Sequence, residues 1–155
     1  MACISARADS AEDRLRQAYA KAESSIDTGH RQDLGSSQGH WRKFRDSYCQ
    51  SVYDEISPGR EAPIERQACR EQLALDRIAE LYFVSVGPSG EFPRILRALE
   101  GAGYERDELV ARLDAMYADE ETWVQYVSVH CELLGRVAAA DEQLCRARMN
   151  FERSY

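Results

Sequence analysis

The sequence predicts an all-α fold, a compact bundle of six or seven helices, and three observations support this class. Apolar residues recur at spacings of three, four and seven along almost the whole chain, the pattern of one helix face. The alternating pattern of a β-strand is nearly absent, since the only β-like fragment, residues 84–86, is too short to pair stably alone. A Trp–Cys spacing that occurs twice indicates two similar helical hairpins. A chain of 155 residues, 44% of them hydrophobic, suits a single domain over residues 1–155.

Three helices are expected in the first half. The first begins near Ser10, which with Asp13 resembles a capping box, and it ends at Gly29. The turn at residues 57–59 separates the second helix from the third, which Pro63 opens at a position where its missing N–H costs nothing. The three apolar stripes comprise Leu15, Ala18, Tyr19, Ala22 and Ile26; Leu34, Trp41, Phe44, Tyr48 and Val52; and Leu73, Ile78, Leu81 and Tyr82.

The second half begins after the clearest linker of the chain, residues 87–90. A short helix over residues 92–99 should end at the glycine-rich stretch 101–103. Three further helices are expected around apolar residues that share one face. These residues are Leu109, Val110, Leu113, Met116 and Tyr117; Trp123, Tyr126, Val127 and Leu134; and Leu144, Met149 and Phe151.

The two halves share a motif, which predicts sub-repeats over residues 10–86 and 91–155. A tryptophan stands eight residues before a cysteine in each half, with an aromatic residue three positions after the tryptophan. A second cysteine is followed directly by arginine and, eight residues after the cysteine, by another arginine. The matched residues are Trp41, Phe44, Cys49, Cys69, Arg70 and Arg77 in the first half and Trp123, Tyr126, Cys131, Cys145, Arg146 and Arg153 in the second.

The cysteines predict one disulfide in each hairpin, Cys49–Cys69 and Cys131–Cys145. Facing ends of antiparallel helices are well placed for such bonds. A disulfide that closes a loop of this size stabilises the folded protein by about 3 kcal/mol. The alternative is four buried free thiols. Disulfides imply an oxidising compartment. The first residues show no charged leader before an apolar stretch, so the protein is either cytosolic with reduced thiols or a chain from which an export signal has been removed. The paired placement of the cysteines favours the second explanation. Cys3 is expected either to stay unpaired or to carry a lipid anchor.

Composition and motifs exclude several functions. With a net charge of −7 and only two lysines, the chain lacks the basic cluster that nucleic-acid binding needs. Its longest apolar runs are too short to cross a bilayer. His30, His40 and His130 are expected at the solvated surface, and His130 cannot pair with its neighbour Cys131, because adjacent helical residues point in different directions. No catalytic residue, metal site or cofactor is therefore expected.

The remaining candidates are tryptophans, acidic segments and turns. Trp41 and Trp123 lie on apolar stripes and are expected to be structural rather than binding platforms. Acidic residues at the start of a helix interact favourably with the helix dipole, which is one explanation for these segments. The second half also carries −5 of the net charge of −7, and such a negative surface would steer a cationic partner toward it. The candidate partner-binding residues are Asp107, Glu108, Asp119, Glu120 and Glu121, and the turn residues Pro58, Gly59 and Arg60; the turn at residues 87–90 is a second candidate for a protruding segment.

The first half resembles the LprI-type lysozyme-inhibitor family over about residues 10–83. The resemblance is carried by Leu34, Gln38, Trp41, Phe44, Arg45, Asp46 and Cys49, followed by Cys69 and Arg77. It implies a small, exported, helical, disulfide-containing bacterial envelope protein without catalytic chemistry, and some members are described as inhibitors of lysozyme. The second half departs from the family pattern, with Val127-Ser128 in place of Arg45-Asp46, and the family's N-terminal cysteine pair is reduced to Cys3.

These observations predict a non-enzymatic binding protein of the periplasm or bacterial envelope. Its partner would be a cationic cell-wall hydrolase or toxin, and its role the neutralisation of a peptidoglycan-cleaving enzyme. Two alternatives stay open: an immunity protein against a secreted antibacterial toxin, and a structural or adaptor protein of the envelope.

Overall fold

The computed structural model describes the backbone of residues 2–154 and the side chains of residues 9–154. Within that range the chain is 83% helical, with seven α-helices and no strand, which confirms the predicted fold class. The helices are α1 Ala2–Ser25, α2 Arg31–Ile56, α3 Ala62–Val86, α4 Glu91–Gly101, α5 Arg106–Asp114, α6 Glu121–Ala138 and α7 Glu142–Arg153.

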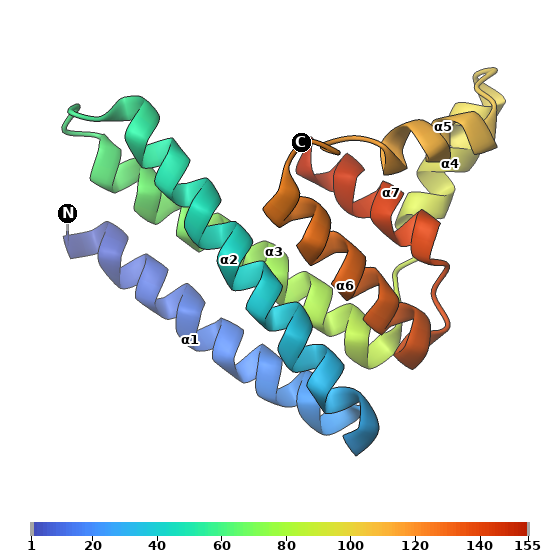
Figure 1. Ribbon diagram of the computed structural model, residues 1–155, viewed down its shortest axis with the longest axis horizontal. Coiled ribbons are helices and arrows are strands. Elements are labelled where there is room, and N and C mark those ends of the chain that lie inside the picture. Colours follow the sequence, from blue (N-terminus) through green and yellow to red (C-terminus); the bar gives the residue numbers. More distant parts are fainter. Residues whose placement is uncertain (1, 155) are drawn as a thin grey trace.

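The three long helices form one layer, and the shorter helices pack against one end of it (Figure 1). α3 packs against both α1 and α2, and α6 packs alongside α2 and also contacts α3. α7 returns along α6, while α4 and α5 extend beyond α7. The opposite ends of α2 and α3 therefore extend away from α6 and α7 on the left of Figure 1, beside the start of α1. We call this projecting hairpin end, residues 48–72, the arm.

Helix boundaries follow from local chemistry. Pro63 lies in the first turn of α3, where no backbone N–H is needed, and Gly87 ends that helix with a φ of 83°, which favours glycine. Asp141 caps α7, because its carboxylate accepts a hydrogen bond of 2.7 Å from the backbone N–H of Leu144.

Three local expectations were wrong. Ser10 lies inside α1 rather than at its start, because the alanine- and arginine-containing segment before it also favours a helix. α1 ends at Ser25, before Gly29, which lies in a 3-10 turn at Thr28–His30. Residues 84–86 form no strand, as expected, and complete α3. Tyr82 is 55% exposed, since it lies beside rather than on the buried stripe of α3.

Both predicted disulfides are present, and each joins the two helices of one hairpin. Cys49–Cys69 links α2 to α3 at the base of the arm, and Cys131–Cys145 links α6 to α7. The Cα atoms are 5.7 Å apart in both pairs, a usual separation for a disulfide. The expectation for Cys3 lies outside the side chains that the structure describes.

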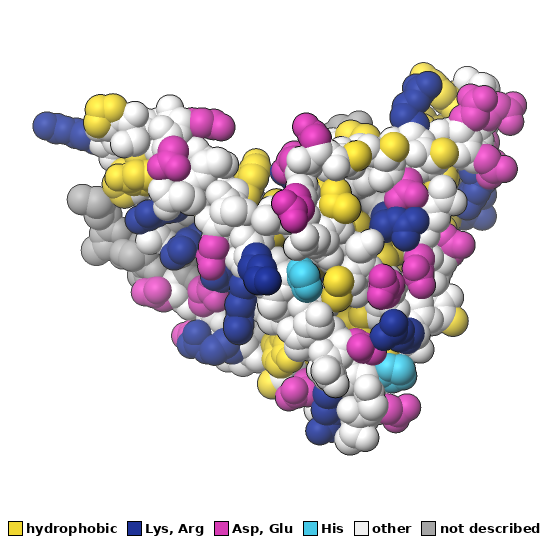
Figure 2. Space-filling model, viewed as in Figure 1, with side chains coloured by type: hydrophobic (Ala, Val, Ile, Leu, Met, Phe, Trp, Pro, Cys, Tyr) yellow, Lys and Arg dark blue, Asp and Glu magenta, His cyan; other side chains and the backbone are white. Residues whose placement is uncertain are grey.

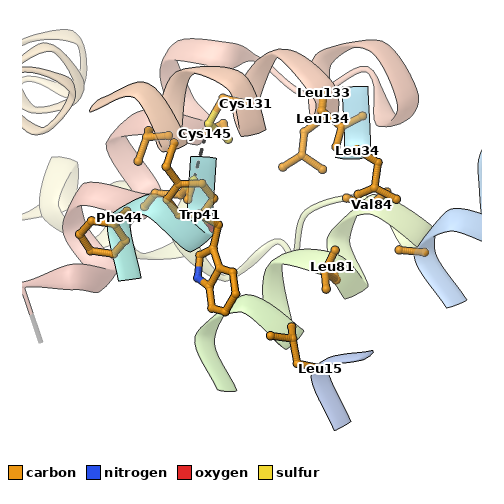
Figure 3. Packing of buried hydrophobic residues seen from close by; sticks show 14 of the residues in the cluster. Leu15, Leu34, Trp41, Phe44, Leu81, Val84, Cys131, Leu133, Leu134 and Cys145 are labelled. Carbon is orange, nitrogen blue, oxygen red and sulfur yellow. Dashed lines mark hydrogen bonds between the residues drawn. A yellow bond between two sulfur atoms is a disulfide. The ribbon is translucent and has the colours of Figure 1, made fainter. Parts of the chain in front are cut away.

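The hydrophobic core is shared between the two halves of the chain. Leu34 of α2, Val84 of α3 and Leu134 of α6 are buried close together, and Trp41 and Phe44 continue the core toward the disulfide of the second hairpin (Figure 3). A smaller cluster, Phe92, Leu96, Val110 and Ala147, attaches α4 and α5 to α7. Because α2 and α6 bury their apolar faces against each other, the position of the arm relative to α6 and α7 is fixed by core packing.

Candidate partner-binding groove

A groove separates the arm from the α6–α7 hairpin. Figure 2 shows the molecule hollowed between the projecting arm and the opposite half. The cavity there has a volume of about 590 Å³, and α2, α3, α6 and α7 all contribute to its walls. Such a volume lies within the range of sites that bind small ligands or side chains.

Aromatic rings from both halves form one wall of the groove. The ring centroid of Phe44 lies 5.6 Å from that of Tyr48 and 4.8 Å from that of Trp123, and Trp123 contacts Tyr126 at 5.6 Å. Tyr48 remains 39% exposed, whereas Phe44 and Trp123 are buried. The wall therefore offers an apolar edge to solvent, backed by a rigid aromatic cluster.

Arg153 at the end of α7 already lies on this aromatic wall. Its guanidinium carbon is 4.4 Å from the ring centroid of Tyr117, 4.6 Å from that of Trp123, and 5.2 Å from those of Phe44 and Tyr48. Its Nη2 donates to the Glu120 carboxylate at 2.5 Å. The wall can thus hold a cation by cation–π contact and an adjacent carboxylate.

A buried polar network lies beneath the groove, centred on Arg77 of α3. Its Nε donates to Oε1 of Gln38 at 2.9 Å, and its Nη2 donates to Oγ of Ser37 at 3.0 Å. Its Nη1 donates to the Tyr126 hydroxyl at 3.2 Å and to Nδ1 of His130 at 3.1 Å. Arg77 is fully buried, so these four neutral acceptors are what satisfies its guanidinium.

His130 connects Arg77 to a buried ion pair. Because Nδ1 accepts from Arg77, the ring hydrogen belongs on Nε2, which donates to Oε2 of Glu80 at 3.0 Å. Glu80 also accepts two hydrogen bonds from Arg148, of 2.6 and 2.7 Å, and Arg148 reaches Glu152 at 2.7 Å. The network therefore runs from α2 through α3 and α6 to α7 and ties the hairpins together.

Burial fixes the charge states within this network. Burial lowers the pKa of His130 to about 4, and the Arg77 charge adds to the effect despite the hydrogen bond to Glu80. Burial alone would raise the pKa of Glu80, but the Arg148 charge and the hydrogen bonds from His130 and Arg148 outweigh it and hold the pKa below its usual range. Burial raises the pKa of Tyr126 to about 12. Near neutral pH the network thus holds neutral His130 and Tyr126 beside ionised Glu80.

Three carboxylates line the groove nearer to solvent: Glu65, Asp76 and Glu152. Burial raises the pKa of Asp76 and of Glu152, and the nearby Glu80 charge adds to both effects. Glu65 and Asp76 take part in no ion pair among the described residues; Asp76 accepts only an uncharged hydrogen bond, from Gln72 at 2.9 Å. The groove therefore combines an aromatic wall with two carboxylates, Glu65 and Asp76, that have no cationic partner among the described residues, and a third, Glu152, that is paired with Arg148.

The motif residues chosen from the sequence occupy structural positions. Gln38 is buried and accepts from Arg77, and Trp41 is buried beneath the Arg45 guanidinium at 4.8 Å. Arg45 also bonds Asp46 at 2.9 Å and Glu12 of α1 at 2.6 Å, which attaches α1 to α2. Trp123 donates from Nε1 to Oδ1 of Asn150 at 2.7 Å.

The predicted partner-binding residues do not form one surface. Asp107 and Glu108 are exposed at the start of α5, and Asp119 and Glu121 are exposed at the start of α6. Glu120, between the latter two, is bound to Arg153. Pro58, Gly59 and Arg60 form the tip of the arm, at the opposite end of the molecule from the start of α5 (Figure 1). The second candidate turn, residues 87–90, instead lies partly against the α6–α7 connection, where a small cavity includes Pro88 and Ala140.

Sequence reasoning missed the charged core, and its expectation for His130 was wrong. His130 is fully buried rather than at the surface. The missed signal was its spacing, since His130 follows Tyr126 by four residues and precedes Leu134 by four, on the apolar face of α6. Glu80, Arg148 and Asn150 were not singled out, because their pairing partners lie far away in the chain. No group of at least three potential metal ligands occurs among the described residues.

A family comparison connects this architecture to a known class of proteins. The model of the family described as "Lysozyme inhibitor LprI" matches residues 1–81, more than half of the chain. The chain belongs to the LprI family. It matches no curated protein sequence and no solved structure. Among the described residues, no helix combines the length and apolar character needed to span a membrane.

Membership places the chain in a family described as lysozyme inhibitors, which implies a protein-binding function. The matched region includes α1, α2 and most of α3, and with them the arm, the first disulfide, Arg77 and Glu80. α4 to α7 lie beyond it, so the wall of the groove that carries Trp123 and Arg153 comes from the second half of the chain.

Proposed function

We propose that this chain is an exported, non-enzymatic binding protein that neutralises a cationic peptidoglycan-cleaving enzyme. The observation that carries the proposal is the LprI match over residues 1–81. The two disulfides support a periplasmic or other envelope location, because such bonds persist in oxidising compartments. The net charge of −7 supports a cationic partner.

In this proposal the acidic segments at the starts of α5 and α6 attract the cationic enzyme and speed its association with the chain. Asp107, Glu108, Asp119 and Glu121 are exposed, and the second half of the chain carries most of the net negative charge. Exposed charges of this kind raise association rates at low salt more than they strengthen the final complex.

The tip of the arm is the segment proposed to enter the enzyme's cleft. Pro58 and Arg60 are exposed, and the turn is closed by hydrogen bonds from Gly59 N to Ile56 O and from Ala62 N to Gly59 O. A Cβ on Gly59 would lie 2.7 Å from the Ile56 carbonyl oxygen, so this tight shape requires glycine. The turn at residues 87–90 is the weaker candidate because of its position beside the α6–α7 connection.

The experiment that tests the function measures residual activity of a panel of muramidases and amidases titrated with the full chain. We expect stoichiometric loss of activity for at least one cationic muramidase. Replacement of residues 57–60 by a Gly/Ser linker of equal length should weaken that inhibition more than the same replacement at residues 87–90, and unchanged inhibition by both variants would leave a helix face as the contact surface. If no enzyme of the panel is inhibited, the proposal is rejected. In a pull-down with the same chain, recovery of a secreted toxin would favour the immunity alternative, and recovery of an envelope assembly would favour the adaptor alternative.

A further inference from the structure

We propose that the groove between the arm and the α6–α7 hairpin receives an arginine- or lysine-bearing segment of the partner protein. The cationic group would lie between Asp76 and Glu152, and the neighbouring apolar side chain would pack against the exposed edge of Tyr48. This inference rests on the proposed function, since the segment belongs to the enzyme, and it names the chemistry by which that enzyme is recognised.

Charge complementarity is the first argument. Four carboxylates line the groove, those of Glu65, Asp76, Glu80 and Glu152, against two cations, Arg77 and Arg153. Glu80 pairs with Arg148, Arg153 pairs with Glu120, and the buried Arg77 is held by neutral acceptors. Glu65 and Asp76 take part in no ion pair among the described residues, and Glu152 shares Arg148 with Glu80. The groove therefore presents excess negative charge to any group that enters it.

The energetic state of these carboxylates is the second argument. Burial and the Glu80 charge raise the pKa values of Asp76 and Glu152, which means that their ionised forms are disfavoured in the free protein. A guanidinium or ammonium group placed between them would reverse that effect. Asp76 bonds Gln72 and makes no hydrogen bond to the buried network, and Arg148 makes two hydrogen bonds to Glu80 besides the one to Glu152.

Arg153 shows that the aromatic wall accommodates a guanidinium group. It packs on rings that include Phe44, Tyr48 and Trp123, and it pairs with a carboxylate at the same time. Tyr48 leaves 39% of its surface open beyond this contact. An incoming cation with an apolar neighbour would meet, within one groove, the carboxylates of Asp76 and Glu152 and the exposed part of Tyr48.

The test compares the double variant Asp76→Asn/Glu152→Gln with Glu100→Gln/Glu132→Gln, whose exposed carboxylates lie outside the groove and make only long ion pairs of 3.7 Å. We expect the groove variant to raise the inhibition constant for the muramidase about tenfold and the control variant to change it less than about twofold. Both variants should unfold at the temperature of the unsubstituted protein or above it. Equal inhibition by the two variants would overturn the proposal.

A second measurement does not depend on the enzyme. The full chain is titrated with N-acetyl-Leu-Arg-amide and with its neutral citrulline analogue, and the two indole N–H signals of Trp41 and Trp123 are followed by NMR. We expect the arginine peptide alone to shift the Trp123 signal, and the shift to be lost in Asp76→Asn/Glu152→Gln. Shifts by this peptide without inhibition of any enzyme would support the groove and reject the proposed function. No difference between the peptides, or self-association of the chain through this face in sedimentation, would overturn the groove proposal.

Discussion

The two hairpins use an equivalent arginine in different ways. Arg77 and Arg153 each stand eight residues after the second cysteine of their half, and each contacts the side chain three positions before the tryptophan. In the first hairpin that partner is the neutral Gln38, and in the second it is the carboxylate of Glu120. Arg77 is fully buried, whereas Arg153 is partly exposed against aromatic rings.

The difference shows that the same position of the repeat can hold a buried arginine that joins helices in one half and an arginine that forms part of the groove wall in the other. A neutral partner leaves the buried Arg77 charge to be balanced through His130 by the more distant Glu80, which binds α2, α3, α6 and α7 into one network. Arg153 has its own counter-charge in Glu120 and lies on aromatic rings at the edge of the groove, where its side chain is 14% exposed. The first hairpin therefore supplies the centre of the molecule and the second supplies a wall of the groove.

The broadest test of this comparison is whether the hairpins can unfold separately. Because the Arg77 network and the shared core join both halves, we expect a single cooperative transition in urea, followed by both circular dichroism and tryptophan fluorescence. Trp41 and Trp123 report on opposite hairpins, so two resolved transitions would show that the halves are independent.

Removal of Arg77 should have the largest effect of any single substitution. Arg77→Met takes the donor away from Gln38, Ser37, Tyr126 and His130, and we expect a loss of about 4 kcal/mol of unfolding free energy. The matched variant Arg153→Met loses a partly exposed ion pair and ring contacts, and should cost only about 1 kcal/mol. Urea denaturation measures both values, and equal costs would contradict the assigned roles.

The two disulfides should have similar thermodynamic but different functional effects. Their sequence separations are 20 and 14 residues, so Cys49→Ala/Cys69→Ala and Cys131→Ala/Cys145→Ala should each lower stability by about 3 kcal/mol. Only the first bond holds the arm. At a temperature where both variants remain folded, inhibition should weaken more in Cys49→Ala/Cys69→Ala than in its counterpart.

As the pH is lowered, protonation of His130 should weaken the network around Arg77 before the carboxylates of the groove are protonated. The unfolded chain binds a proton at His130 near its ordinary pKa of 6.5, but the folded chain only near pH 4, so stability is present above pH 6.5 and falls as pH decreases. The lowered pKa of His130 corresponds to a loss of about 3 kcal/mol of unfolding free energy as the pH falls from the ordinary pKa to the folded one. Below pH 4.5 the lowered pKa of Glu80 adds a further loss, whereas the raised pKa values of Asp76 and Glu152 act in the opposite direction.

The variant His130→Gln isolates the histidine in this pH dependence. Its amide oxygen can accept from Arg77 and its amide nitrogen can donate to Glu80, yet it does not titrate. We expect urea denaturation at pH 7 and at pH 4.5 to give a smaller difference for His130→Gln than for the unsubstituted chain. An unchanged difference would assign the acid sensitivity to the carboxylates instead.

The sequence predicted the helical class, the disulfides and the helix order because each rests on local patterns. Apolar spacing identifies the buried face of a helix, and a repeated Trp–Cys spacing identifies two stapled hairpins. The same local reasoning failed at Ser10, where a capping motif lies within a longer helix, and at Tyr82, one position away from the buried stripe.

The groove could not be predicted, because it depends on how the halves pack. Asp76 and Glu152 are 76 residues apart in the sequence and look like ordinary solvated acids until α3 and α7 line the same cavity. Glu80 and Arg148 form an ion pair across a comparable separation. The repeat did indicate Arg77 and Arg153, but not that one would be buried among neutral groups and the other stacked on rings.

The smallest expected effect concerns the acidic segments outside the groove. Neutralising Asp107, Glu108, Asp119 and Glu121 to their amides should slow association with a cationic muramidase by less than about tenfold at low salt, flatten its salt dependence and leave dissociation within about twofold. Adding Glu120→Gln should act differently, because Glu120 holds Arg153 against the groove wall and its loss should also speed dissociation. Stopped-flow measurements across a salt series separate the two rates. If the four exposed residues changed dissociation as strongly as Glu120→Gln, they would belong to the contact surface itself, and the division between a steering surface and a binding groove would fail.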